Sequence, residues 1–260
     1  MEKFAESCGG NLLGQGKYTK GLSVCFGLDS KILWKCIKNK LPYIYIDKSV
    51  LFDIKERFGR VRVGINKIHN STPIERPADR LNSLSIKLKN WNKTGKHILI
   101  CPPTEAGYTK GGLWRNSPYI ILDIQPAWLE LTIRKIREVS DRKIVIRPKV
   151  WSVRYDKIIS AIKNVEASDK SLDEDFKDCW ATVAPSSGVS ILGLIKGIPS
   201  FCDPNKLASS CSLSDYSKIE TPLYCDRNKL FNHLSYLDFS INEIEDGTAW
   251  DIIEKTMNEL

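Results

Sequence analysis

The strongest constraint on the fold is the repeated alternation of short apolar runs with longer amphipathic stretches. Residues 22–26 (LSVCF) are followed by apolar residues at helical spacing over 32–37, and then by the β-branched and aromatic run LPYIYID at 41–47. A strand, a helix and a second strand joined by short links form a β-α-β unit, which implies a parallel sheet. The pattern restarts at 97–101 (HILIC) and continues to 198–202 (IPSFC). The chain is therefore predicted to be an α/β protein.

A polar connector separates the two series of strands and helices. Residues 70–95 are largely polar and contain two prolines. We therefore expect two small Rossmann-like lobes, residues 1–95 and residues 96–260, with a cleft between them. Residues 227–260 have a helical pattern that is broken near 239–243, and these C-terminal helices are expected to pack back across the lobes. A single doubly wound domain spanning the chain is the alternative.

The composition excludes several other classes of protein. The 260 residues are 42% hydrophobic, so the chain can bury a core, yet no stretch approaches the ~20 apolar residues of a membrane span. The eight cysteines are scattered without CxxC spacing and only three histidines are present, which disfavours a zinc finger. The N-terminus lacks the apolar core of a secretory leader. We expect a cytoplasmic protein with reduced, buried cysteines and no metal site.

The net charge of +8 conceals an uneven distribution. Residues 1–150 contain 28 basic and 13 acidic residues, whereas residues 151–260 contain 11 and 18. Such an asymmetry is typical of proteins that contact nucleic acid or membranes. A solvated, lysine-rich surface without a polyanionic partner is an equally good interpretation.

A small-residue turn between an expected strand and an expected helix is the sharpest local feature. The segment APSSGVS at 184–190 contains Ser186, Ser187 and Gly188. The first backbone N–H groups of a helix have no internal partners, and the helix dipole places partial positive charge there. The turn is therefore predicted to hold a phosphate or diphosphate. A serine that merely caps the helix is the alternative.

Two basic residues follow the expected strand at 143–146. Arg147 and Lys149 lie at its carboxyl end, which is the edge where open α/β sheets bind ligands. The guanidinium group is suited to bidentate phosphate binding and the ammonium group supplies a point charge. We predict that both contact the same phosphates, with a solvated strand end as the alternative.

Three further residues are candidates for binding or proton transfer. Glu220 precedes a proline turn and could accept hydrogen bonds from ribose or sugar hydroxyls, or cap a helix or pair with Arg227. Asp47 ends the strand at 41–47 and is a candidate general base, as is His69. A surface aspartate and an ordinary structural histidine are the alternatives for these two.

Taken in order, these segments resemble a group of phage and bacterial proteins related to capsule-type glycosyltransferases of two-lobed, GT-B-like fold. The resemblance spans about residues 41–255. The segments that carry it are YIYIDKSVLF, RVRVGIN, HILICPPTEA, SDRKIVIRPK, VAPSSGVSILGLIKGIPSFCDP, IETPLYCDR and FSINEIEDGTAW.

The resemblance implies a function for each of the candidate residues. The turn at Ser186, Ser187 and Gly188 would hold the phosphates of a nucleotide-sugar such as a UDP-sugar, and Arg147 and Lys149 would face the same diphosphate. No metal or cofactor is expected. The catalytic base has no counterpart by motif. Lys48-Ser49-Val50 stands where related chains have a bulky aromatic turn.

The expected acceptor follows from the charge of the first lobe. Residues 1–95 contain 18 basic and 8 acidic residues, so we predict double-stranded DNA carrying a hydroxymethylated pyrimidine, consistent with the phage resemblance. This expectation places the protein in the cytoplasm of an infected bacterial host. Transfer to a cell-surface or capsular glycan is the first alternative. A non-catalytic nucleic-acid-binding phage protein on a transferase-like fold is the second.

Overall fold

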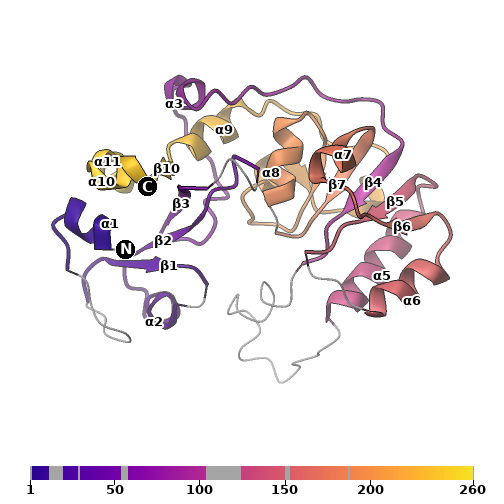
Figure 1. The fold of residues 1–260 in the computed structure, drawn as a ribbon, viewed down its shortest axis with the longest axis horizontal. Coiled ribbons are helices and arrows are strands. Elements are labelled where there is room, and N and C mark those ends of the chain that lie inside the picture. Colours follow the sequence, from indigo (N-terminus) through magenta and orange to yellow (C-terminus); the bar gives the residue numbers. More distant parts are fainter. Residues whose placement is uncertain are drawn as a thin grey trace. The chain divides into compact units, whose positions relative to one another are not determined.

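The computed structural model divides the chain into two compact units (Figure 1). Unit 1 comprises Met1–Ile86 and Asn228–Leu260, and unit 2 comprises Lys87–Arg227. The structure describes residues 2–11, 20–28, 30–53, 58–103, 124–149, 153–186 and 188–259.

Unit 1 is built on a four-stranded sheet. Its strands are β1 (Ser23–Phe26), β2 (Tyr43–Lys48), β3 (Arg60–Ile65) and β10 (Asp238–Ser240), in the order β1-β2-β3-β10. β1 and β2 are parallel and flank α2 (Lys31–Asn39), which confirms the β-α-β unit predicted from the sequence. β3 is antiparallel to β2, because the link between them is shorter than the dozen or more residues that a parallel crossover requires.

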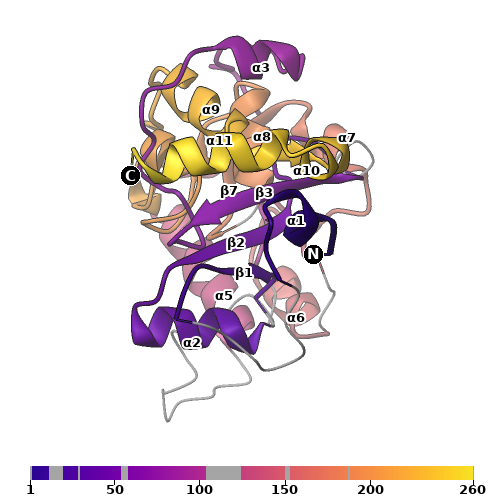
Figure 2. The same cartoon turned by 90° about the vertical axis from the view of Figure 1, so that its left-hand side faces the viewer.

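The C-terminal segment belongs to unit 1. It contains α9 (Asn228–Ser235), β10, α10 (Ile241–Glu245) and α11 (Thr248–Met257), which complete a unit that also contains α1 (Glu2–Ser7) and α3 (Asp79–Ser83). Figure 2 shows α10 and α11 beside α1. The expected helical break at 239–243 contains part of a strand instead: β10 pairs with β3, and Phe239 is fully buried in the core of the unit.

These boundaries differ from the predicted division at residue 95. The connector joins unit 2 from Lys87 onward, since the amides of Lys89 and Asn92 donate to the carbonyls of Ile195 and Gly197 at 2.9 and 2.7 Å. Gly197 has a φ of 78°, and a Cβ at this position would lie 2.0 Å from the carbonyl oxygen of Asn90. Only glycine allows the connector to approach so closely.

Unit 2 contains a six-stranded parallel sheet in the order β6-β5-β4-β7-β8-β9. The strands are β4 (His97–Ile100), β5 (Lys143–Ile146), β6 (Val165–Ala167), β7 (Cys179–Val183), β8 (Ser200–Phe201) and β9 (Ser212–Leu213). Its helices are α5 (Ile124–Arg137), α6 (Val153–Ala161), α7 (Leu172–Phe176) and α8 (Gly188–Ile195), with short 3₁₀ turns η1 (Ser209–Cys211) and η2 (Tyr216–Lys218).

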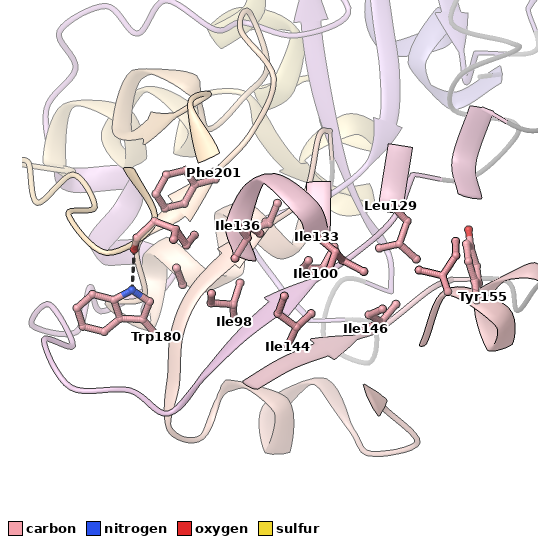
Figure 3. Packing of buried hydrophobic residues seen from close by; sticks show 14 residues of the cluster. Ile98, Ile100, Leu129, Ile133, Ile136, Ile144, Ile146, Tyr155, Trp180 and Phe201 are labelled. Carbon is pink, nitrogen blue, oxygen red and sulfur yellow. Dashed lines mark hydrogen bonds between the residues drawn. The ribbon is translucent and has the colours of Figure 1, made fainter. Parts of the chain in front are cut away.

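Helices cover both faces of this sheet. Alternate strand residues such as Ile98 and Ile144 pack against Leu129 and Ile133 of α5 on one face (Figure 3). The intervening residues pack against α7 and α8 on the other face, as Leu99 does. This alternation is the period of two that a strand buried on both sides requires. Unit 2 is thus a doubly wound α/β sheet, and the α/β class predicted from the sequence is confirmed.

Candidate functional site

The carboxyl ends of four neighbouring strands in unit 2 lie side by side. The hydrogen-bonded ladder continues one residue past them: Ser168 N donates to Ile146 O, Arg147 N to Ile100 O and Cys101 N to Val183 O, at 2.8 to 2.9 Å. Ser168, Arg147, Cys101 and Ala184 therefore follow one another along the sheet edge. At about 4.8 Å per strand, Arg147 and Ala184 are separated by about 10 Å.

This edge contains the topological switch point of the sheet. From β4 the chain proceeds to β5 and β6 on one side, and later to β7, β8 and β9 on the other. The helices that follow β4 and β7 cover opposite faces, so the ends of these two strands mark the place where doubly wound sheets bind ligands. We use the name carboxyl-edge site for Cys101, Arg147, Lys149, residues 184–186 and Gly188.

The small-residue turn lies between β7 and α8. Ala184 and Pro185 are buried, Ser186 is exposed, and α8 begins at Gly188. The hydroxyl of Ser190 donates to the carbonyl of Ala184 at 3.3 Å, which fixes the turn to the first turn of the helix. The amino end of α8 is thus held at the sheet edge, as predicted. Ser187 lies outside the described residues.

Arg147 is anchored by a buried carboxylate. Its Nη1 donates to Asp175 Oδ2 at 2.9 Å and to Lys170 O at 2.5 Å. Asp175 is 3% exposed, and both of its carboxylate oxygens accept from the Ser168 hydroxyl, at 2.6 and 2.8 Å. Lys149 is exposed two residues beyond Arg147. Both predicted basic residues therefore belong to the carboxyl-edge site.

Sequence reasoning missed three residues at this edge. Ser168 precedes α7 and Asp175 lies within it. The start of this helix has a sequence signature, the Ser171-x-x-Glu174 capping box. Asp203 follows β8, and its amide donates to Pro185 O at 3.1 Å beside the serine turn. Burial raises the pKa of the Asp203 carboxyl, with Lys206 opposing the shift.

Cys101 is an inert member of the edge. Burial raises the pKa of its thiol to about 12, and the nearby Arg147 lowers it only in part. A thiol with this pKa is protonated at neutral pH and is not a nucleophile.

Glu220 does not join the carboxyl-edge site. Its carboxylate accepts from Arg142 Nε at 3.0 Å and from the Ser140 hydroxyl at 2.5 Å. Both partners precede β5, whereas Arg147 follows it, so Glu220 lies at the amino edge of the sheet. Arg142 also stacks over the Trp180 ring at 4.0 Å. The contacts of Glu220 in the structure are thus those of a packing residue.

The two candidate bases belong to unit 1, on either side of Arg62. Asp47 Oδ2 accepts from Arg62 Nη2 at 3.0 Å and from the Tyr45 hydroxyl at 2.8 Å. Arg62 Nη1 donates to the carbonyl of Ile68 at 2.9 Å, next to the half-buried His69. Burial, followed by the charge of Asp47, raises the pKa of the Tyr45 hydroxyl.

The described residues contain neither a candidate metal centre nor a membrane-spanning helix. Within the described ranges, no group of three or more histidine, cysteine or acidic side chains is arranged to hold a metal ion. None of the helices in the described part of the chain is both long enough and apolar enough to span a bilayer.

Comparison with known proteins identifies the fold. No protein-family model and no curated protein sequence matches the chain. Among solved structures it is similar to KpsC of Thermosulfurimonas dismutans, a β-Kdo 2,7-transferase, with a TM-score of 0.58 and 14% identity over 100% of this chain and 96% of the other. A β-Kdo 2,4-transferase, also KpsC of that organism, has a TM-score of 0.47 and 13% identity over 88% and 86%. The first of these likenesses shows a glycosyltransferase-like α/β fold.

Proposed function

We propose that this protein is a glycosyltransferase that moves a sugar from a nucleotide-sugar to a hydroxyl acceptor. One observation carries the proposal: the amino end of α8, Arg147 and Lys149 all lie along the carboxyl edge of a doubly wound sheet, at its switch point. Backbone N–H groups, a guanidinium and an ammonium are the groups that bind phosphates in proteins. The fold shared with a Kdo transferase supports the same reaction class.

The site would contribute to the reaction by stabilising the leaving group. Breaking the bond between sugar and phosphate leaves additional negative charge on the departing nucleotide. The partial positive charge at the amino end of α8, together with Arg147 and Lys149, would stabilise that charge. Asp203, whose amide donates to Pro185 O, would accept hydrogen bonds from donor hydroxyls, a role for which Glu220 was one candidate in the sequence.

The acceptor hydroxyl needs a base, and we assign that part to unit 1. Asp47 is half-exposed at the end of β2, but Arg62 and Tyr45 both donate to its Oδ2. Proton abstraction by Asp47 would therefore use Oδ1, which accepts from the amide of Lys48 at 2.8 Å. His69 is the second candidate because an imidazole titrates near neutral pH.

A glycan is the acceptor that the charges favour. Residues 228–260 contain seven acidic and two basic residues, and as part of unit 1 they reduce its balance to 17 basic and 15 acidic. Several of these acids pair with basic residues of the N-terminal part: Asp238 with Arg60, Glu243 with Arg80, and Glu259 with Arg76. Much of the basic excess on which a DNA acceptor was expected is thereby neutralised.

DNA with a hydroxymethylated pyrimidine is the second candidate acceptor, and one feature favours it. Lys31, Lys38 and Lys40 are exposed on α2 and at its end, and this helix contains no acidic residue. Such a face would contact phosphates without reading sequence.

A ligand screen followed by a transfer assay tests the proposal. Thermal unfolding is followed with UDP, GDP, CMP and their sugars, including activated Kdo, because a ligand at 100 times its Kd adds about 2.7 kcal/mol. The nucleotide-sugar that stabilises the protein is then offered with oligosaccharides and with hydroxymethylcytosine-containing duplex. We expect stabilisation and transfer to a glycan. DNA binding without any nucleotide effect would instead indicate a non-catalytic nucleic-acid-binding protein and overturn the proposal.

A further inference from the structure

We infer that Asp175, held by Ser168, is a positioning residue that orients Arg147 for the phosphates of the donor. This inference rests on the proposed function, since it concerns how the same carboxyl-edge site is built. In this inference Asp175 and Ser168 do not contact the donor and act through Arg147, which does.

The strand order dictates that Ser168 and Arg147 are neighbours. Ser168 follows β6 and Arg147 follows β5, and the Ser168 amide donates to Ile146 O at 2.8 Å. The chain then forms α7, whose capping box at Ser171 and Glu174 fixes its first turn. Asp175 is in the last turn of this short helix and is directed back to the strand ends, where it meets both side chains.

The contacts orient one end of the guanidinium only. Nη1 of Arg147 donates to Asp175 and to the Lys170 carbonyl, whereas Nη2 has no hydrogen-bond partner within the described ranges. The Asp175 side chain is 2% exposed and that of Arg147 is 28% exposed. A guanidinium held at its buried end has less rotational freedom to lose when a phosphate binds at the other end.

Two explanations of what Asp175 does, one by its charge and one by positioning Arg147, predict opposite changes in phosphate affinity for Asp175→Asn. The substitution therefore distinguishes between them. The Asp175 carboxylate partly cancels the charge of Arg147. If net charge alone governed phosphate binding, Asp175→Asn would bind phosphate more tightly. If orientation governs, the same change releases Arg147 and weakens binding, as loss of a supporting residue commonly does.

The test is a titration of the full chain with inorganic pyrophosphate and with the nucleotides of the screen. Asp173→Asn is the matched control: it makes the same chemical change on α7, at an exposed residue that pairs with Lys196. We expect about tenfold weaker pyrophosphate binding in Asp175→Asn and unchanged binding in Asp173→Asn. Ser168→Ala, which removes only the support of Asp175, is expected to weaken binding by about threefold.

A double-variant cycle shows whether Asp175 acts through Arg147. In an Arg147→Ala background, Asp175→Asn should no longer affect pyrophosphate affinity, because the residue it orients is absent. A purely structural role would lower affinity in both backgrounds. If Asp175→Asn fails to fold, the cycle is run with Ser168→Ala.

The outcomes separate this inference from the proposed function. Equal or tighter binding in Asp175→Asn, or an effect that persists without Arg147, overturns the positioning role and leaves the proposed function standing. Absence of pyrophosphate and nucleotide binding in the wild-type protein overturns both.

Discussion

Two arginines at opposite ends of β5 show how similar ion pairs serve different purposes. Arg142 precedes the strand and pairs with Glu220, whereas Arg147 follows it and pairs with Asp175. The two arginine side chains are equally exposed, at 28%, but Glu220 is 35% exposed and Asp175 only 2%. Arg142 is covered by Trp180, and its Nε and Nη1 donate to Glu220 and the Gly95 carbonyl. The pair Arg142–Glu220 at the amino edge thus stabilises the fold. The pair Arg147–Asp175 at the carboxyl edge orients a partly exposed cation.

The largest expected effect is on stability at the carboxyl edge. Arg147→Ala leaves the buried Asp175 without its cation, and loss of one partner of a buried pair costs about 3 to 5 kcal/mol. Chemical denaturation should show this loss, and Asp175→Asn added to Arg147→Ala should recover much of it. A loss below about 1 kcal/mol would mean that Asp175 does not need its cation.

A third pair, Arg60–Asp238 in unit 1, gives the next effect. Burial raises the pKa of Asp238 to about 6, so its contribution to stability is lost as pH rises through 6. Burial lowers the pKa of the fully buried His233 to about 4, so its contribution is lost as pH falls from 6.5 toward 4. With rising pH, Asp238 therefore lowers the free energy of unfolding and His233 raises it, over the same pH range.

The substitution His233→Leu should therefore reveal the pH dependence of stability that Asp238 causes. Neither ring nitrogen of His233 has a hydrogen-bond partner in the described part of the chain, so the substitution breaks no hydrogen bond there. Between pH 4 and pH 6.5 we expect the stability of the variant to fall, relative to that of the wild-type protein, by about 3 kcal/mol. Denaturant midpoints across this range measure it. Parallel curves for the two proteins would contradict these pKa shifts.

A smaller effect is expected at the amino edge. Arg142→Ala removes an ion pair, a carbonyl contact and a cation–π contact, together about 2 kcal/mol. Because Glu220 remains partly hydrated, the loss should be less than that in Arg147→Ala. Thermal unfolding of the two variants side by side measures the difference. A greater loss of stability in Arg142→Ala would contradict the assignment of Arg147 to the more strongly stabilising ion pair.

The smallest effect should come from Glu220→Gln. Partly exposed ion pairs contribute about 1 kcal/mol or less, and the amide oxygen can still accept from Ser140. Nucleotide affinity should not change, since Glu220 is at the other edge of the sheet. Isothermal titration with the stabilising nucleotide checks this. A tenfold loss of nucleotide affinity would instead indicate that Glu220 contacts the donor.

Local patterns predicted the parts of the fold that depend on nearby residues. The β-α-β unit of β1, α2 and β2 follows from apolar spacing. Its helix is capped by Ser30, which accepts from Leu33 N at 3.3 Å. The turn before α8 and the basic residues after β5 were also evident, because both adjoin strand ends. The division into units was less accessible, since β10 joins unit 1 through a pairing between residues about 180 positions apart.

The partners of the site residues depend on long-range packing and were not predictable. Glu220 follows a parallel strand, and only the path of the chain through η2 returns it to the amino edge beside Arg142. Asp175 reads as one acid among several in LDEDF. Its burial is set by the packing of α7 on the sheet, where the adjacent Phe176 enters the core.

The central claim is that the carboxyl edge of unit 2 binds the phosphates of a nucleotide-sugar. The most direct measurement is calorimetric titration of the stabilising nucleotide-sugar into the wild-type protein, Arg147→Ala and Arg142→Ala. We expect saturable binding to the wild-type protein, about 10- to 100-fold weaker binding to Arg147→Ala, and wild-type affinity in folded Arg142→Ala. Equal affinity in all three proteins, or a loss confined to Arg142→Ala, would contradict it.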